Sequence, residues 1–169
     1  IKPIQIHGGS MRYYVCHNDQ SKDKKISLRL NNLLKEEYKK GYDKKSTFIN
    51  YARKVDRTKT KLMSLLKKLK LKNFSIAGYG ASGRANTLIQ YCGIDNTLLD
   101  YIIDDAPMKQ GYFTPGSHLK IVSRDKLEEK TPDYILIFAW SFFNEIIEKN
   151  SKYLHKGVKF IIPLPMVKI

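Results

Sequence analysis

Apolar stretches alternate with helix-like stretches along the second half of the chain. Short apolar runs typical of buried strands occupy the ranges 74–77, 98–105, 121–122, 133–140 and 158–162. Helical patterns occupy the intervening ranges 84–92, 124–130 and 142–154. Strands that alternate with helices are typical of a parallel sheet with helices on both faces. The pattern therefore predicts an α/β fold of Rossmann-like type, with a mostly parallel, doubly wound sheet over residues 73–169.

The first part of the chain shows other patterns. Residues 1–17 contain two strand-like pieces on either side of Gly8-Gly9, which could form a hairpin or be the last strands of a domain upstream of this chain. A polar connector over residues 18–25 follows. Amphipathic patterns then predict helices over about 27–41 and about 46–70. In the second of these helices, apolar residues recur every seven positions, at Phe48, Val55, Leu62 and Leu69.

The net charge of +15 raises the question of a polyanionic partner. Residues 22–72 carry 18 of the 31 Lys and Arg residues but only 5 of the 16 acids, so nearly all of the excess lies in the predicted helices. Nucleic-acid-binding surfaces usually add aromatic platforms or arginine forks to such charge, so a lysine-rich, solvated helix face is the simpler interpretation. We therefore expect no specific nucleic-acid partner, only non-specific binding to polyanions at low salt.

Cysteines and hydrophobic runs narrow the location of the protein. Cys16 and Cys92 have no metal-type spacing, so we expect no metal site and no disulfide framework. This cysteine usage favours a reducing, cytoplasmic compartment. No apolar run is long enough to span a membrane, and residues 1–3 do not resemble the start of a signal peptide, so no membrane partner is expected.

A glycine-rich turn between the strand at 74–77 and the following helix is the strongest candidate for ligand chemistry. Its G-x-G-x-x-G is made by Gly78, Tyr79, Gly80, Ala81, Ser82 and Gly83. In such a turn the first glycine takes the tight bend, the second lets the backbone approach a ligand, and the third lets helix and strand pack closely. Free N–H groups and the helix dipole then face an anion, and Arg84 adds a charged donor. We interpret the turn as a nucleotide or diphosphate cradle, although a glycine-lined turn that binds nothing fits the same pattern.

Further candidates follow the later strands. Asp104 lies 21 residues after Gly83, where a dinucleotide-binding fold places the carboxylate that hydrogen-bonds a ribose hydroxyl; a loop or N-cap carboxylate is an equal alternative. The long loop over 106–120 begins at the carboxyl end of a strand, where ligands of open α/β sheets bind. Trp140 ends another strand and either faces the same crevice or belongs to the core. The loop residues that could meet a phosphate or sugar are Lys109, Tyr112, Thr114, Gly116, Ser117 and His118.

Several stretches, taken together, span nearly the whole chain in order and carry a more specific signal than the glycines alone. They are H-G-G-S-M-R-Y-Y at 7–14, G-A-S-G-R-A-N-T-L at 80–88, Y-C-G-I at 91–94, K-Q-G at 109–111, T-P-G-S-H at 114–118 and F-I-I-P-L-P at 160–165. In these stretches the chain resembles the C-terminal domain of the sugar-nucleotide C-methyltransferases. Those enzymes use S-adenosylmethionine to methylate a carbon of a deoxysugar attached to a nucleoside diphosphate.

The resemblance implies that residues 1–17 are the end of an upstream methyltransferase domain, 18–72 a helical connector and 73–169 a Rossmann-like C-terminal domain. It implies two partners, a nucleoside-diphosphate sugar and the upstream methyltransferase domain. The methyl-donor site and the family's catalytic motif would lie upstream, so S-adenosylmethionine is a cofactor of the parent protein only. We assign this chain no catalytic residue and no cofactor, and we expect it to be inactive alone. Its expected role is a sugar-nucleotide-binding or docking domain in deoxysugar biosynthesis.

Three other interpretations stay open. The chain could be an NAD(P)-binding Rossmann domain of a sugar-nucleotide oxidoreductase or epimerase, with Asp104 on the ribose, but it has no Tyr-x-x-x-Lys pair. It could be a basic nucleic-acid-binding or scaffold module. The glycine turn could also be a relict in a domain that serves only for docking.

Overall fold

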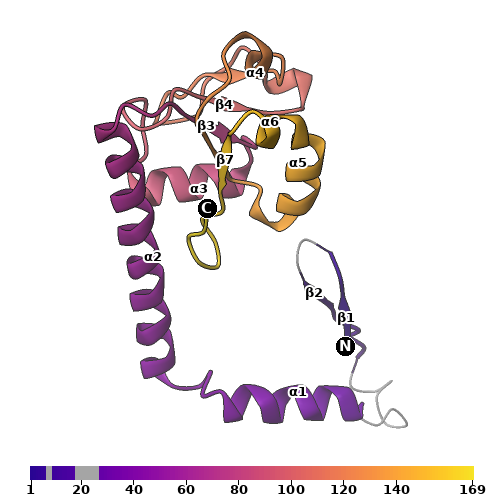
Figure 1. The fold of residues 1–169 in the computed structure, drawn as a ribbon. Coiled ribbons are helices and arrows are strands. Elements are labelled where there is room, and N and C mark those ends of the chain that lie inside the picture. The colour runs from indigo at the N-terminus through magenta and orange to yellow at the C-terminus, as the bar shows by residue number, and fades with distance from the viewer. Residues whose placement is uncertain (7–8, 18–26) are drawn as a thin grey trace. The chain divides into compact units, whose positions relative to one another are not determined.

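A computed structural model describes residues 1–6, 9–17 and 27–169. The chain divides into two compact units, Ile1–Lys54 and Val55–Ile169, which are described separately (Figure 1). The boundary falls inside one long helix, α2 (Lys45–Leu71). The divisions expected from the sequence near residues 17 and 72 stay predictions. His7, Gly8 and the connector at 18–26 lie outside the described residues.

The first unit contains a two-stranded sheet and helical segments. Strands β1 (Lys2–Ile4) and β2 (Ser10–Arg12) pair antiparallel, as the hairpin interpretation expects. Helix α1 (Leu28–Lys39) begins at Ser27, whose Oγ accepts a hydrogen bond from the Leu30 amide at 3.3 Å. None of the residues of α1 is buried. This unit therefore has secondary structure but little core of its own.

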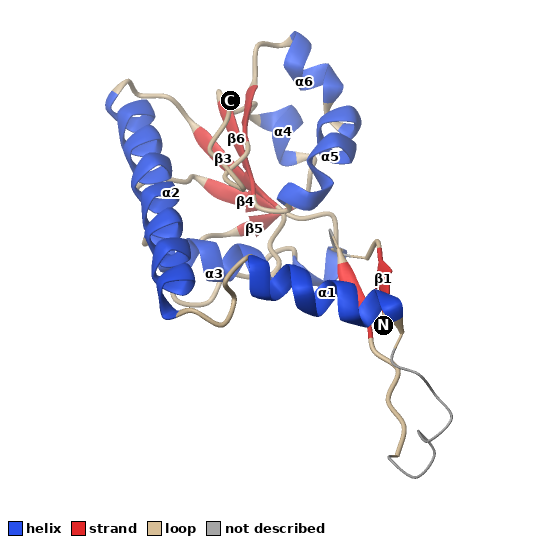
Figure 2. Cartoon of the chain, turned by 90° about the horizontal axis from the view of Figure 1, so that it is seen from below, coloured by secondary structure: helices blue, strands red, loops and turns tan. Residues whose placement is uncertain are grey.

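The second unit is built on a five-stranded parallel sheet (Figure 2). Its strands are β3 (Ile76–Tyr79), β4 (Tyr101–Ile103), β5 (Ile121–Val122), β6 (Tyr134–Ile137) and β7 (Lys159–Ile161), in the spatial order β5-β4-β3-β6-β7. All neighbouring pairs are parallel. The chain order reverses between β3 and β6, which is the arrangement of a Rossmann-like, doubly wound sheet. The predicted fold class is confirmed.

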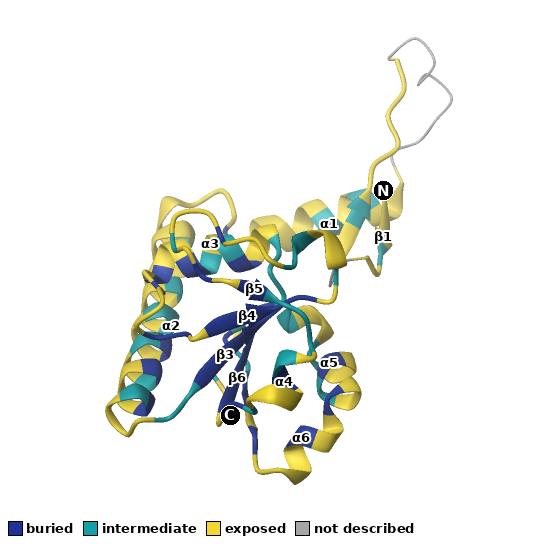
Figure 3. Ribbon diagram, turned by 90° about the horizontal axis from the view of Figure 1, so that it is seen from above, coloured by how far each residue is buried: buried dark blue, intermediate teal, exposed yellow. Residues whose placement is uncertain are grey.

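Helices cover both faces of this sheet, because alternate side chains of each strand point to opposite sides. One face packs against the second half of α2 and against α3 (Gly83–Cys92), and the other packs against the short helices α4 (Lys126–Glu129), α5 (Phe143–Lys149) and α6 (Ser151–His155) (Figure 2). In β3, Ile76 belongs to the first core and Ala77 to the second. The strands are the most deeply buried part of the unit (Figure 3).

Two helical expectations need correction. The apolar stripe of α2 is buried only at Leu62, Leu66 and Leu69, which belong to the second unit, whereas Phe48, which belongs to the first unit, is 60% exposed. The single helix expected over 142–154 is interrupted at Asn150. The Asn150 side chain donates to the Ile146 carbonyl at 2.7 Å, so it competes with the helical backbone there.

The glycines of the turn have roles different from those expected. A Cβ at Gly78 would lie 2.7 Å from Phe138 Cε2, so the first glycine provides the close packing. Gly80 has φ +94° and would place a Cβ 3.1 Å from the Cβ of Ala139, so the second glycine makes the bend and passes close to protein. A Cβ at Gly83 would meet nothing within 4 Å, so the expected packing role of the third glycine is wrong.

These differences predict opposite outcomes for two alanine substitutions. Gly78→Ala should lower the free energy of unfolding by about 1–3 kcal/mol, because the added methyl group overlaps the Phe138 ring. Gly83→Ala should change it by no more than about 0.5 kcal/mol, because the site is open. Urea unfolding of both variants measures the difference, and equal destabilisation would contradict this account.

Candidate ligand site at the carboxyl edge of the sheet

The point where the strand order reverses lies between β3 and β6. In open α/β sheets, ligands bind outside the carboxyl ends of the strands at this point. Two connections meet here: the glycine turn after β3, and the segment after β6 that contains the 3₁₀ helix η3 (Trp140–Phe142). The two connections pack against each other where Gly80 lies next to Ala139.

Three backbone amides of the turn, those of Gly80, Ala81 and Ser82, already have protein partners. The Gly80 amide donates to the Ile103 carbonyl at 2.7 Å, and the Ser82 amide donates to the Gly80 carbonyl at 3.1 Å. The Ala81 amide donates to Asp104 Oδ2 at 2.7 Å. Ser82 Oγ caps α3 by accepting from the Ala85 amide at 3.2 Å. None of these three amides is therefore left for a ligand in this structure.

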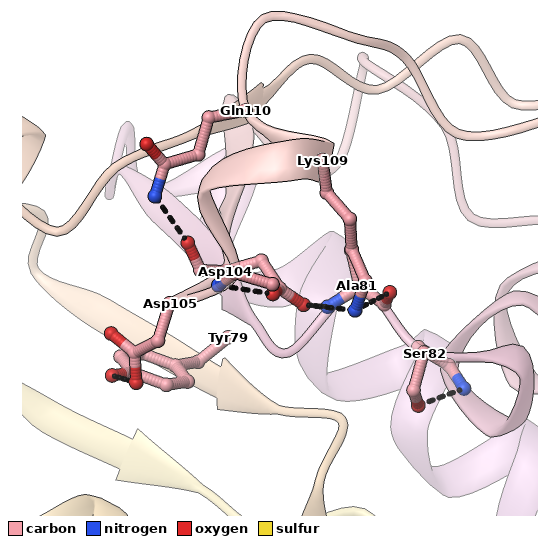
Figure 4. Close-up of polar contacts among 9 residues, drawn as sticks. Tyr79, Ala81, Ser82, Asp104, Asp105, Lys109 and Gln110 are labelled. Atoms are coloured by element: carbon pink, nitrogen blue, oxygen red, sulfur yellow. Dashed lines mark hydrogen bonds and ion pairs between the residues drawn. The ribbon is translucent and has the colours of Figure 1, made fainter.

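Asp104 is the centre of a small polar network at the turn (Figure 4). Besides the Ala81 amide, its carboxylate accepts from the Ala106 amide at 2.9 Å and from Lys109 Nζ at 3.0 Å. Lys109 Nζ also donates to the Ala81 carbonyl at 3.0 Å, and Gln110 Nε2 donates to the Asp104 carbonyl at 2.9 Å. Asp104 is only 7% exposed. Asp104 thus acts as a carboxylate that stabilises the turn and the loop after β4, which is one of the two roles expected from the sequence. The other role, contact with a ribose hydroxyl, stays a prediction.

Arg84 and Trp140 face each other across the point where the strand order reverses. The Arg84 guanidinium carbon lies 5.5 Å from the centroid of the Trp140 ring, within cation–π range. Arg84 is exposed and Trp140 is half-buried. Within the described ranges, no carboxylate forms an ion pair with Arg84. The guanidinium thus keeps its hydrogen-bond donors available at the edge where ligands of such folds bind.

A second polar network lies beside the first. Asp105 Oδ2 accepts from Tyr79 Oη at 2.9 Å and from Lys149 Nζ at 2.7 Å. Burial and the neighbouring Asp105 carboxylate raise the pKa of Tyr79 to about 12. Burial acts to raise the pKa of Asp105, but the hydrogen bonds from Lys149 and Tyr79 and the positive charges of Lys149 and Arg124 outweigh it and lower that pKa. Tyr79 therefore stays protonated at neutral pH, and Asp105 stays ionised.

The loop over 106–120 does not present its candidate residues together. Phe113 pairs antiparallel with Lys120, so the loop folds back on itself. Thr114 is buried; its Oγ1 accepts from the Leu119 amide at 3.0 Å and lies 2.6 Å from Ser117 Oγ. Gly116 packs against Gln90 of α3, whose Nε2 donates to the Pro115 carbonyl at 2.8 Å. The tip of the loop is thus held against the last turns of α3, away from the start of that helix.

The structure divides the sequence-derived candidates into groups. Gly80, Ala81, Ser82, Asp104 and Lys109 come together in the closed network, and Arg84 and Trp140 come together beside it. Thr114 and Gly116 stabilise the loop, and Tyr112 and His118 are exposed on it. Gly78 packs inside the sheet. Ligand contact by any of these residues stays a prediction.

Several residues that shape this edge carry no signal in the sequence. Asp105, Gln110 and Lys149 take part in the two networks, and Gln90 fixes the loop tip. Asp105 could have been noted as the second acid at a strand end, but the two glutamines and Lys149 look like ordinary surface residues.

Across the part of the chain that the structure describes, no group of three or more His, Cys, Asp or Glu side chains could hold a metal ion. Nor does any described helix have the length and apolar character needed to cross a membrane.

The lowered pKa of Asp105 predicts a change in acid stability. A carboxyl group whose pKa is lower in the folded than in the unfolded chain contributes stability above its unfolded pKa of about 3.9, and this is lost as the pH falls through the folded pKa. From about pH 5 to about pH 2, the unmodified chain should lose more free energy of unfolding than Asp105→Asn, as measured by urea unfolding. Asp43→Asn, at an exposed aspartate of the first unit, should lose as much as the unmodified chain. Equal losses in all three proteins would contradict the prediction.

Comparison with known proteins shows which family this chain belongs to. The family described as "C-methyltransferase C-terminal domain" matches residues 5–165. The C-methyltransferase NovU of Streptomyces niveus is 27% identical over 169 residues, which is 100% of this chain and 40% of NovU. The chain therefore spans less than half the length of that relative. By this match over nearly its whole length, the chain belongs to the C-methyltransferase C-terminal domain family.

Proposed function

We propose that this chain is the substrate-side domain of an S-adenosylmethionine-dependent sugar C-methyltransferase and that it binds a nucleoside-diphosphate sugar at the carboxyl edge of its sheet. Family membership and the similarity to a C-methyltransferase support the reaction class. The observation that carries the binding role is the exposed Arg84 guanidinium, whose carbon lies 5.5 Å from the centroid of the Trp140 ring where the strand order reverses. The methyl donor would bind in another part of the parent protein, in a reducing, cytoplasmic compartment that suits the two free cysteines.

Arg84 suits a diphosphate for chemical reasons. A guanidinium offers a planar set of N–H donors that can bind two phosphate oxygens at once. The cation–π contact with Trp140 restricts the Arg84 side chain before a ligand arrives, which reduces the entropy lost on binding. The open space at Gly83 lets a ligand reach the guanidinium from the start of α3, where the helix dipole also favours negative charge. In this proposal the diphosphate lies beside Arg84 and does not use the occupied amides of Gly80, Ala81 and Ser82.

A substitution at Arg84 tests this role. Arg84→Met keeps much of the contact with Trp140 but removes the charged donors, so it should weaken binding of dTDP-glucose or GDP-mannose about tenfold, equivalent to about 1.4 kcal/mol. Isothermal titration of the parent protein measures the change, and Lys67→Met, at an exposed lysine of α2, is the matched control. Unchanged affinity in Arg84→Met, or no binding of either sugar nucleotide to the unmodified protein, would contradict the proposal. Tighter binding of NADH would favour the dinucleotide alternative.

The first unit supports a second role, docking onto the methyltransferase domain of the parent protein. Leu28, Leu34 and Tyr38 of α1 are 74%, 53% and 73% exposed, which is unusual for an amphipathic helix with an apolar stripe. A hollow of about 540 Å³ lies between β1, β2 and α1, with lining residues that include Pro3, Met11 and Leu33. Apolar surface of this kind commonly marks an interaction site.

The docking role predicts a destabilisation that appears only in the parent protein. Leu34→Glu should lower the Tm of the parent by several degrees, because it places a charge in the proposed interface. It should leave the Tm of this chain alone unchanged within about 1 °C, because Leu34 is already exposed. Lys35→Glu, at the neighbouring exposed position, controls for charge. An equal effect of Leu34→Glu in both proteins, or none in either, would contradict docking through α1.

A further inference from the structure

The carboxylate of Asp104 occupies the place that an anionic ligand would need in the glycine turn. It accepts from the Ala81 amide at 2.7 Å, from the Ala106 amide at 2.9 Å and from Lys109 Nζ at 3.0 Å (Figure 4). Asp104 is 7% exposed, so the contact is enclosed. Ala81 belongs to the glycine turn, Ala106 and Lys109 belong to the loop after β4, and all three donors converge on one carboxylate.

This donor set is the one that phosphate sites use. Backbone amides in a turn before a helix and a cationic side chain are the usual partners of a phosphate in such folds. Here the protein supplies the anion itself, from the residue directly after β4. The Lys109 ammonium is neutralised by this ion pair and is also held by the Ala81 carbonyl at 3.0 Å.

A phosphate that approached the turn would meet two obstacles. It would have to displace the carboxylate from the Ala81 amide, and it would be repelled by the negative charge of that carboxylate. The neighbouring amides of Gly80 and Ser82 offer no alternative, because they donate to the carbonyls of Ile103 and Gly80.

We propose that Asp104 is a specificity-determining residue: its carboxylate is the resident anion of the glycine turn and closes the Ala81 amide to phosphate. The domain keeps the glycine motif and the sheet order of a dinucleotide-binding fold but excludes dinucleotide cofactors from that mode of binding. This inference does not depend on the proposed sugar-nucleotide role, because the turn is equally closed in a domain that only docks. It restricts that role to contacts outside the turn, such as Arg84.

Removal of the carboxylate should open a phosphate site. Asp104→Ala frees the amides of Ala81 and Ala106 and the Lys109 ammonium together, so inorganic pyrophosphate should bind this variant at least tenfold more tightly than the unmodified chain and should raise its Tm. The double variant Asp104→Ala/Lys109→Met should lose this gain. Asp105→Ala, which removes the neighbouring carboxylate and also frees a lysine, Lys149, is the matched control and should gain less than twofold.

The outcome can overturn the proposal in several ways. Equal pyrophosphate affinity in the unmodified chain and in Asp104→Ala would do so, as would an equal gain in Asp105→Ala. If Asp104→Ala does not fold, the amide resonances of the unmodified chain decide: the signals of Ala81 and Ala106 should not move when pyrophosphate or NADH is added, and a saturable shift would contradict the proposal. The same titration with dTDP-glucose separates the two ideas, since a missing response at Arg84 counts against sugar-nucleotide binding and leaves the closed turn intact.

Discussion

The hydrogen bond from the Ala81 amide to the Asp104 carboxylate determines which backbone amides are occupied at the carboxyl edge of the sheet. A buried backbone amide needs a hydrogen-bond acceptor, and in dinucleotide-binding folds the phosphates of the ligand accept from amides of the glycine turn. Here the acceptor is the carboxylate of Asp104, the residue directly after β4. Because the same carboxylate also binds Ala106 and Lys109, one side chain ties the turn to the start of the following loop. The amides of Gly80, Ala81 and Ser82 therefore have partners without a ligand.

The position of the glycine turn could be predicted from the sequence, but the group that occupies the turn could not. Its position, the start of α3 at Ser82 and the end of α3 at Gly93 follow from local preferences, since Gly80 and Gly93 have positive φ values and Ser82 caps the helix. What occupies the turn does not follow, because it depends on the rotamer of Asp104 and on a lysine five residues later. The glycine roles differ from the expected ones for a similar reason: Phe138 and Ala139, which directly follow β6, decide which glycine is crowded.

The fold as a whole was predictable because strands and helices here have strong local patterns. The parallel sheet and its helices follow from alternating apolar runs, and the hairpin from the residues around Gly8-Gly9. Long-range contacts were not predictable. The contact of the loop tip with Gln90 joins residues 25 positions apart, and the ion pair of Lys149 with Asp105 joins residues 44 positions apart. The helix break at Asn150 is local, since it depends on a side-chain hydrogen bond to Ile146 that the apolar pattern does not reveal.

The domain has the sheet order of a dinucleotide-binding fold, and our proposal places ligand contact outside the occupied amides, at Arg84. The most direct test is an experimental structure of the parent protein with a bound nucleoside-diphosphate sugar. The account predicts that Asp104 still accepts from the Ala81 amide and that the diphosphate lies beside the Arg84 guanidinium. A diphosphate on the amides of Ala81 and Ser82, with the Asp104 side chain turned away, would contradict it.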